Sequence, residues 1–231
     1  NSLSVGGANF SGSINVQAGT FESTKASQIA SLAVTGANVI VNHKLSVTKA
    51  VLTAGQIQGK STFTIQDGSM MSQGFNINAT TVITGNFTVT GSVISVGKMG
   101  GLTVAKGAVF TAQDATSVSG PAGTKGLTNN GQVVVQGALS VTNVNIMGAG
   151  SVMVADMFTV GTITMSQGVV ALSGNGKFVG ATTDISMINQ ITGTPGVTGS
   201  VGAYSFTCDK ACKSLSTTGI PTTKFIFSVS A

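Results

Sequence analysis

The chain has 231 residues, of which 42% are apolar and only 7% are charged, where an ordinary soluble domain is about 25% charged. With one His, no Trp and no Arg, it is short of the side chains that serve acid–base, metal and phosphate chemistry, which argues against most enzymes. The net charge of +5 comes from dispersed lysines, and without Arg there are no bidentate phosphate or guanine contacts, so we expect a solvated surface and no nucleic-acid partner.

A three-residue unit recurs from the start of the chain: a large apolar residue, a small polar residue, then Val or Ile. Side chains alternate on a strand, so each unit predicts a short strand with two residues facing inward and one facing outward. Most copies begin 11 to 19 residues apart. Clear copies are Leu3-Ser4-Val5, Leu45-Ser46-Val47, Phe63-Thr64-Ile65, Phe87-Thr88-Val89, Leu102-Thr103-Val104, Leu139-Ser140-Val141 and Phe158-Thr159-Val160.

Gly and Asn stand near these units, as in Gly85-Asn86 and Asn129-Asn130-Gly131, and predict tight corners. Short strands and regular corners predict an all-β chain that winds as a parallel β-solenoid (β-helix), with a small C-terminal β appendage. Turns of about 18 residues over residues 1–185 would give about ten turns. The alternative is an antiparallel β-sandwich, which has similar strand spacing but more hairpin signals than this chain shows.

Three stretches interrupt the repeat. Residues 22–31 are predicted as a short helix over the first turns or as a loop, and residues 113–126 as a surface insertion. We expect three parts: a solenoid at 1–185, a Gly-rich hinge at 186–202 and a hairpin-like β appendage at 203–231. The appendage is predicted because its two apolar pieces alternate with a period of two.

Cys208 and Cys212 are the only cysteines. A metal site would need further ligands, and the sole His, His43, is far away in the sequence, so no metal ion or cofactor is expected. In a secreted chain, the pair predicts a disulfide that closes a five-residue loop, with free thiols as the alternative.

No two acidic residues fall within 20 positions of each other, so the sequence predicts no carboxylate pair and no catalytic residues. His43 is predicted to be a corner or surface residue. Thr-x-Thr occurs at Thr62/Thr64, Thr88/Thr90 and Thr162/Thr164, which is too sparse for the flat Thr ladder that ice binding needs.

Two phrases, Leu127-Thr128-Asn129-Asn130-Gly131-Gln132-Val133 and Gly137-Ala138-Leu139-Ser140-Val141, resemble the degenerate repeats of secreted β-helix adhesins. Filamentous-haemagglutinin-type and autotransporter passenger domains are the nearest comparison, over residues 1–185. The resemblance implies an extracellular structural or adhesive role and transfers no functional residues. The chain is much shorter than those proteins.

A soluble solenoid needs polar caps on its end turns. Neither end of this sequence resembles a cap, so we predict an assembly interface that joins copies of the chain. Its predicted residues are Leu3 and Val5 at one end and Phe225, Phe227 and Val229 at the other.

The sequence therefore predicts a non-catalytic protein, secreted or at a cell surface, that serves as a fibre subunit and forms homo-oligomers or filaments. Contact with a polysaccharide or a cell surface fits this role. No apolar run reaches 18 residues, so no membrane span is expected. The alternatives are a carbohydrate-binding or polysaccharide-processing β-helix and an ice-binding or surface-binding solenoid.

Overall fold

A computed structural model describes residues 2–7, 9–71, 75–91, 94–96, 100–118, 120, 126–146, 150–165, 169–172, 177–183, 190–193, 198–201, 204–208, 215–217 and 226–229. The regular elements in these residues are 25 strands. They are β1 (Ser2–Val5), β2 (Asn9–Val16), β3 (Thr20–Ser23), β4 (Ser27–Val41), β5 (Leu45–Gln58), β6 (Thr62–Met71), β7 (Asn76–Ile77), β8 (Thr80–Ile83), β9 (Asn86–Thr90), β10 (Ile94–Val96), β11 (Leu102–Val104), β12 (Val109–Ala112), β13 (Thr116–Val118), β14 (Leu127–Asn129), β15 (Gln132–Val135), β16 (Leu139–Ile146), β17 (Ser151–Val154), β18 (Met157–Met165), β19 (Val169–Leu172), β20 (Lys177–Thr183), β21 (Gln190–Gly193), β22 (Thr198–Val201), β23 (Tyr204–Cys208), β24 (Leu215–Thr217) and β25 (Ile226–Val229).

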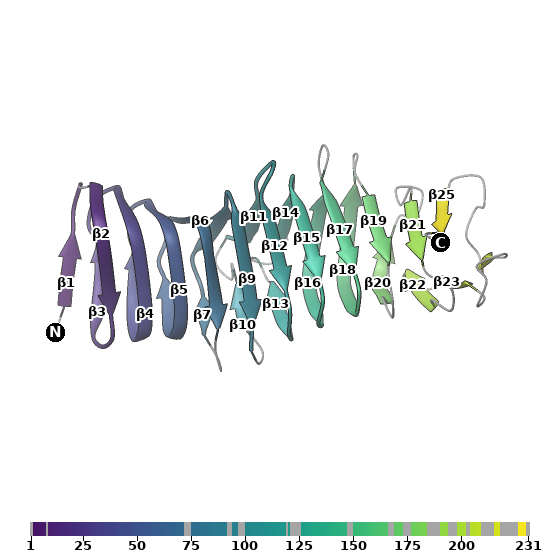
Figure 1. Cartoon of the computed structure of the whole chain (residues 1–231), viewed down its shortest axis with the longest axis horizontal. Helices are drawn as coiled ribbons and strands as arrows, with labels where there is room; N and C mark the ends of the chain where they lie inside the picture. Colours follow the sequence, from purple (N-terminus) through teal and green to yellow (C-terminus); the bar gives the residue numbers. More distant parts are fainter. Residues whose placement is uncertain are drawn as a thin grey trace.

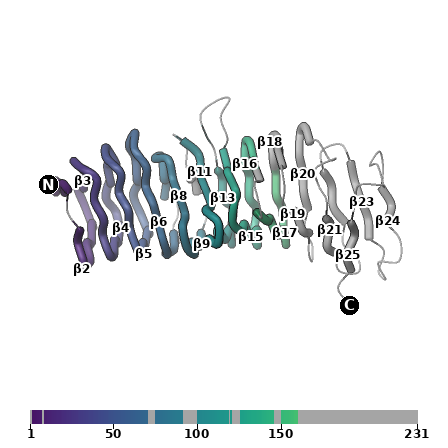
Figure 2. Tube along the Cα trace, turned by 90° about the horizontal axis from the view of Figure 1, so that it is seen from above, coloured from purple at the N-terminus to yellow at the C-terminus, as the bar shows by residue number. Residues whose placement is uncertain are grey.

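Strands β1 to β20 form one continuous sheet that coils into a rod, with successive turns stacked along its length (Figure 1). Its strand pairings are parallel. Figure 2 shows the same turns from above, side by side. The predicted parallel β-solenoid is therefore confirmed, and the antiparallel sandwich is wrong.

Each turn of the rod contributes a segment to three parallel ladders. Ladder 1 contains β1, β3, β7, β10 and β13. Ladder 2 contains β8, β11 and β14, and ladder 3 contains β9, β12, β15, β17 and β19. The longer strands bend around corners and pass from one ladder to the next: β4 pairs with both β2 and β3, for example.

The turns become longer along the rod. Stacked residues are 18 positions apart in the early turns, as for Thr20 and Asn38, but 22 apart for Ile94 and Thr116 and 23 apart for Thr116 and Leu139. The rod holds about eight turns. The prediction of about ten was too high, because it assumed 18 residues for every turn.

The three-residue units fill the interior as predicted. In Leu45-Ser46-Val47 and Phe63-Thr64-Ile65, the first and third side chains are buried and the middle one is half-buried. The units stack in register, with Leu45 on Phe63 and Val47 on Ile65. Each inward side chain is thus covered by the turns before and after it, and the columns of stacked side chains form one continuous core.

Two of the predicted interruptions are strands instead. Residues 22–31 lie in β3 and β4 and the corner between them, so the predicted short helix and the alternative loop are both wrong. The helix prediction failed because Ser23 and Ser27 occupy inward positions, where they are buried and break the apolar pattern. Within 113–126, residues Thr116–Val118 form β13 in ladder 1, so that part of the predicted insertion is also wrong.

Buried polar side chains are used at the corners of the coil. Asn129 lies inside the rod at the end of β14, where its Nδ2 donates to the carbonyl oxygen of Ser151 (2.8 Å) and its Oδ1 accepts from the N–H of Gly131 (3.1 Å). Ser27, Thr81 and Thr116 each donate a hydroxyl hydrogen bond to the carbonyl two residues earlier. These bonds satisfy backbone groups that a corner withdraws from the ladders.

We expect Asn129→Ala to lower the free energy of unfolding by about 2 kcal/mol, because it leaves two backbone partners unsatisfied and opens a small cavity. The control is Asn130→Ala at the half-buried neighbouring position, which should cost less than about 0.5 kcal/mol. Chemical denaturation of both variants measures the difference. Equal losses would show that the corner does not depend on the buried amide.

The strands beyond β20 form two small sheets. β21 pairs with β25 in parallel, and β22, β23 and β24 form an antiparallel sheet. The predicted boundaries at 185, 202 and 203 stay predictions. Cys212 lies outside the described residues, and of Cys208 the structure describes only the backbone at the end of β23, so the disulfide also stays a prediction.

Candidate functional site

The first turn of the rod exposes side chains that belong to the core. Leu3 stacks in register on Phe21, yet Leu3 is 55% exposed and Phe21 is fully buried. Phe10 stacks on Ile29 and is 40% exposed, whereas Ile29 is fully buried. Leu3 and Phe10 are exposed because a turn covers each of them on one side only. We call the surface formed by β1, β2 and these two side chains the open first turn.

The open first turn also carries strand edges. In the part of the chain that the structure describes, β1 pairs only with β3 and β2 only with β4. The carbonyl oxygen of Val5 accepts from the N–H of Thr24 (2.8 Å), so the backbone of Val5 faces β3. Successive residues of a strand point their backbone groups to opposite sides, so the N–H and carbonyl of Ser4 face the open side.

The structure treats the predicted assembly residues differently. Leu3 lies on the open first turn as predicted, but Val5 is only 4% exposed and belongs to the core. Phe227 and Val229 lie in β25, and Phe225 lies outside the described residues. Phe10 was missed because it begins no three-residue unit. Its spacing of 19 residues from Ile29, close to one turn, was the signal that identifies it.

The acidic side chains that the structure describes in detail hold corners. Glu22 Oε1 accepts from Asn42 Nδ2 (2.6 Å), Asp67 Oδ1 accepts from the N–H of Asn86 (2.8 Å), and Asp114 Oδ2 accepts from the N–H of Gly91 (2.8 Å). Each bond joins neighbouring turns. No group of three or more His, Cys, Asp or Glu side chains lies together among the described residues.

His43 lies at an exposed corner between β4 and β5, as predicted. Its backbone N–H donates to Ser23 Oγ (3.3 Å), and its carbonyl accepts from the same hydroxyl (2.9 Å). The Thr-x-Thr pairs do not share one ladder: Thr64 stacks on Val82 in ladder 2, and Thr88 stacks on Thr111 in ladder 3.

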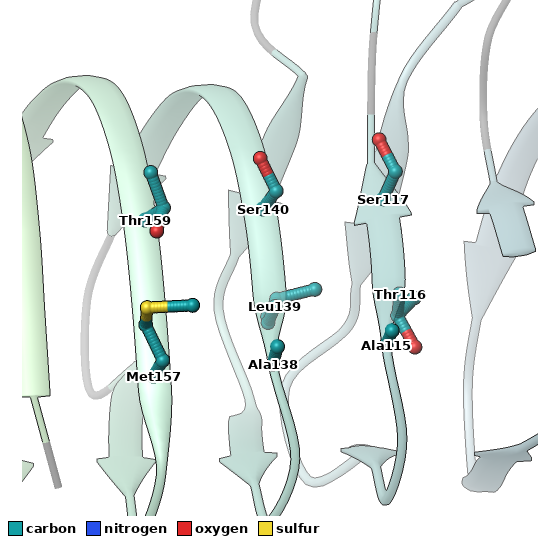
Figure 3. Close-up of a pocket in the computed structure, with 8 residues that line it drawn as sticks. All are labelled: Ala115, Thr116, Ser117, Ala138, Leu139, Ser140, Met157 and Thr159. Atoms are coloured by element: carbon teal, nitrogen blue, oxygen red, sulfur yellow. The ribbon is translucent and has the colours of Figure 1, made fainter. Parts of the chain in front are cut away.

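A shallow depression of about 200 Å³ lies on the outside of ladder 1 (Figure 3). Two rows of side chains line it across three successive turns, with small residues beside the half-exposed Met157. The lining residues are Ala115, Thr116, Ser117, Ala138, Leu139, Ser140, Met157 and Thr159. Sites for small organic ligands usually measure about 300–1,000 Å³, so the depression is too small to be a typical one.

No family model, curated protein or solved structure matches the chain. The resemblance to secreted β-helix adhesins therefore stays a prediction. In the part of the chain that the structure describes, we find no helix with the length and hydropathy needed to cross a membrane.

Proposed function

We propose that this chain is a non-catalytic extracellular structural or adhesive protein, a fibre subunit whose rods join end to end. The observation that carries the proposal is the open first turn, where Leu3 and Phe10 are about half exposed beside two strand edges with free backbone groups. Exposed edges of this kind pair readily with further strands. The resemblance of residues 1–185 to secreted β-helix adhesins supports the extracellular location.

The partner that best fits the open first turn is a second copy of the chain. The strands of the rod pair in parallel, so a copy shifted along the rod axis presents strands in the direction that β1 and β2 require. At the other end of the chain, β25 also pairs in parallel, with β21. Contact between two different ends is heterologous, and it continues into an open filament rather than closing as a dimer.

Backbone pairing must supply much of the free energy of this association. Completing the burial of Leu3 and Phe10 would contribute roughly 2 kcal/mol in total, since each is already about half covered. Association itself costs about 4 kcal/mol or more in lost translational and rotational freedom. A change that removes a hydrogen-bond donor from the open edge should therefore weaken assembly strongly.

Ser4→Pro is the matching test, because it deletes the one N–H of β1 that we assign to the centre of the open edge. A proline is tolerated on an edge strand when its nitrogen faces solvent, so the internal β1–β3 pairing should persist. We expect sedimentation velocity over a concentration series to show growing filaments for the natural chain and for the control Ser4→Ala, and single rods for Ser4→Pro.

Thermal unfolding of dilute Ser4→Pro should match that of Ser4→Ala, which would show that the rod is intact. The proposal is wrong if the natural chain stays monomeric at every concentration or stops at a dimer. It is also wrong if Ser4→Pro assembles as well as Ser4→Ala.

A further inference from the structure

Three successive corners between ladders 1 and 2 each carry an exposed lysine. The corners are Thr24-Lys25-Ala26, Asn42-His43-Lys44 and Gly59-Lys60-Ser61. They stack directly: Ser27 N–H donates to the carbonyl of Lys44 (2.9 Å), and Ser61 N–H donates to the carbonyl of Val41 (3.1 Å). We call Lys25, Lys44 and Lys60 the lysine row. It runs parallel to the rod axis, with one charge on each turn.

The lysine row carries a net positive charge. The acidic side chain that shares these corners is Glu22, and its Oε1 accepts from Asn42 Nδ2 (2.6 Å). Asp67 belongs to ladder 3, beyond the whole width of ladder 2. Like charges on adjacent strands repel one another, so the row destabilises the coil slightly unless an anion lies against it.

We propose that the lysine row binds a linear polysaccharide with one carboxylate on each sugar, lying along the rod axis. Turns are spaced at about 4.8 Å, and flexible lysine side chains on that repeat can each reach a carboxylate of an extended chain. The exposed hydroxyl group of Thr24 and the exposed amide group of Asn42 flank the row and suit hydrogen bonds to sugar hydroxyls.

A nucleic acid fits this corner less well. Apart from Phe10, the aromatic side chains that the structure describes are buried, so the corner offers no surface on which bases stack. The chain also has no Arg for bidentate phosphate contacts. The proposal does not depend on end-to-end assembly.

The test is binding of fluorescent polygalacturonate to the full-length chain at low salt, with Lys44→Gln/Lys60→Gln as the variant. The control, Lys49→Gln/Lys106→Gln, removes the same charge from two exposed lysines outside the row. We expect the row variant to bind about fivefold more weakly and the control less than about twofold, with affinity falling as salt rises.

Circular dichroism and unfolding of both variants should match the natural chain, since all four lysines are exposed. Equal losses in the two variants would mean that net charge alone attracts the polymer, and would overturn the proposal. So would no measurable binding, affinity that is unchanged by salt, or tighter binding to single-stranded DNA than to polygalacturonate.

Discussion

Replacing Phe110 with alanine is expected to lower the free energy of unfolding by about 3–5 kcal/mol. Phe110 is fully buried in ladder 3, stacked between Phe87 on the turn before and Val133 on the turn after. The backbone ladders hold these turns at a fixed spacing, so they cannot close together over the cavity. The loss should therefore lie toward the upper part of the range for buried aromatic residues.

The matched control for Phe110→Ala is Val109→Ala on the same strand, where the side chain faces outward and is half-buried. It should cost less than about 1 kcal/mol. Urea denaturation followed by circular dichroism compares the two variants. Similar midpoints for both would contradict the stacked core, because the two positions differ in which side of β12 they occupy.

Gly55→Ala is expected to cost more than about 2 kcal/mol for a different reason, a clash with the backbone. Gly55 has a φ of 111°, and a Cβ there would lie 2.1 Å from the carbonyl oxygen of Ala37 on the turn below. The residue pairs with Ala37 at an irregularity in the β4–β5 ladder, so neither strand can move aside without breaking the register.

Two other glycines separate the clash from the cost of the backbone angle. Gly107 has a φ of 80° with open space around its Cβ position, so Gly107→Ala should cost only about 1 kcal/mol. Gly12 has open space and lies outside the left-handed region, so Gly12→Ala should be neutral or slightly stabilising. The expected order of unfolding midpoints, from highest to lowest, is Gly12→Ala, then Gly107→Ala, then Gly55→Ala. An equal effect at Gly55 and Gly107 would show that the close approach of the turns has no cost.

The solenoid was predictable because its signal is local. In Leu45-Ser46-Val47, the alternation of burial is written in three adjacent residues, and it needs no knowledge of the neighbouring turn. The failures occurred where a residue's role is set by its neighbours in space. Ser27 sits inside the rod because its hydroxyl donates to the carbonyl of Lys25, a bond that no hydrophobic pattern reports.

The candidate site was only half predictable for the same reason. Leu3 begins a recognisable unit, whereas Phe10 is identified as a core residue only by its register with Ile29. Val5 was predicted as an interface residue from its position in the sequence, but the next turn buries it. The lysine row also needed the structure, because the spacings between Lys25, Lys44 and Lys60 are unequal and only the corners reveal their alignment.

Diffraction from aligned filaments of the concentrated protein tests the end-to-end joining of rods most directly. If the open first turn receives the far end of another copy, the spacing of about 4.8 Å between turns must lie along the filament axis. The expected result is filaments with a strong reflection at that spacing on the meridian. Filaments that show it across their axis, or a concentrated solution that holds only separate rods, would contradict this account.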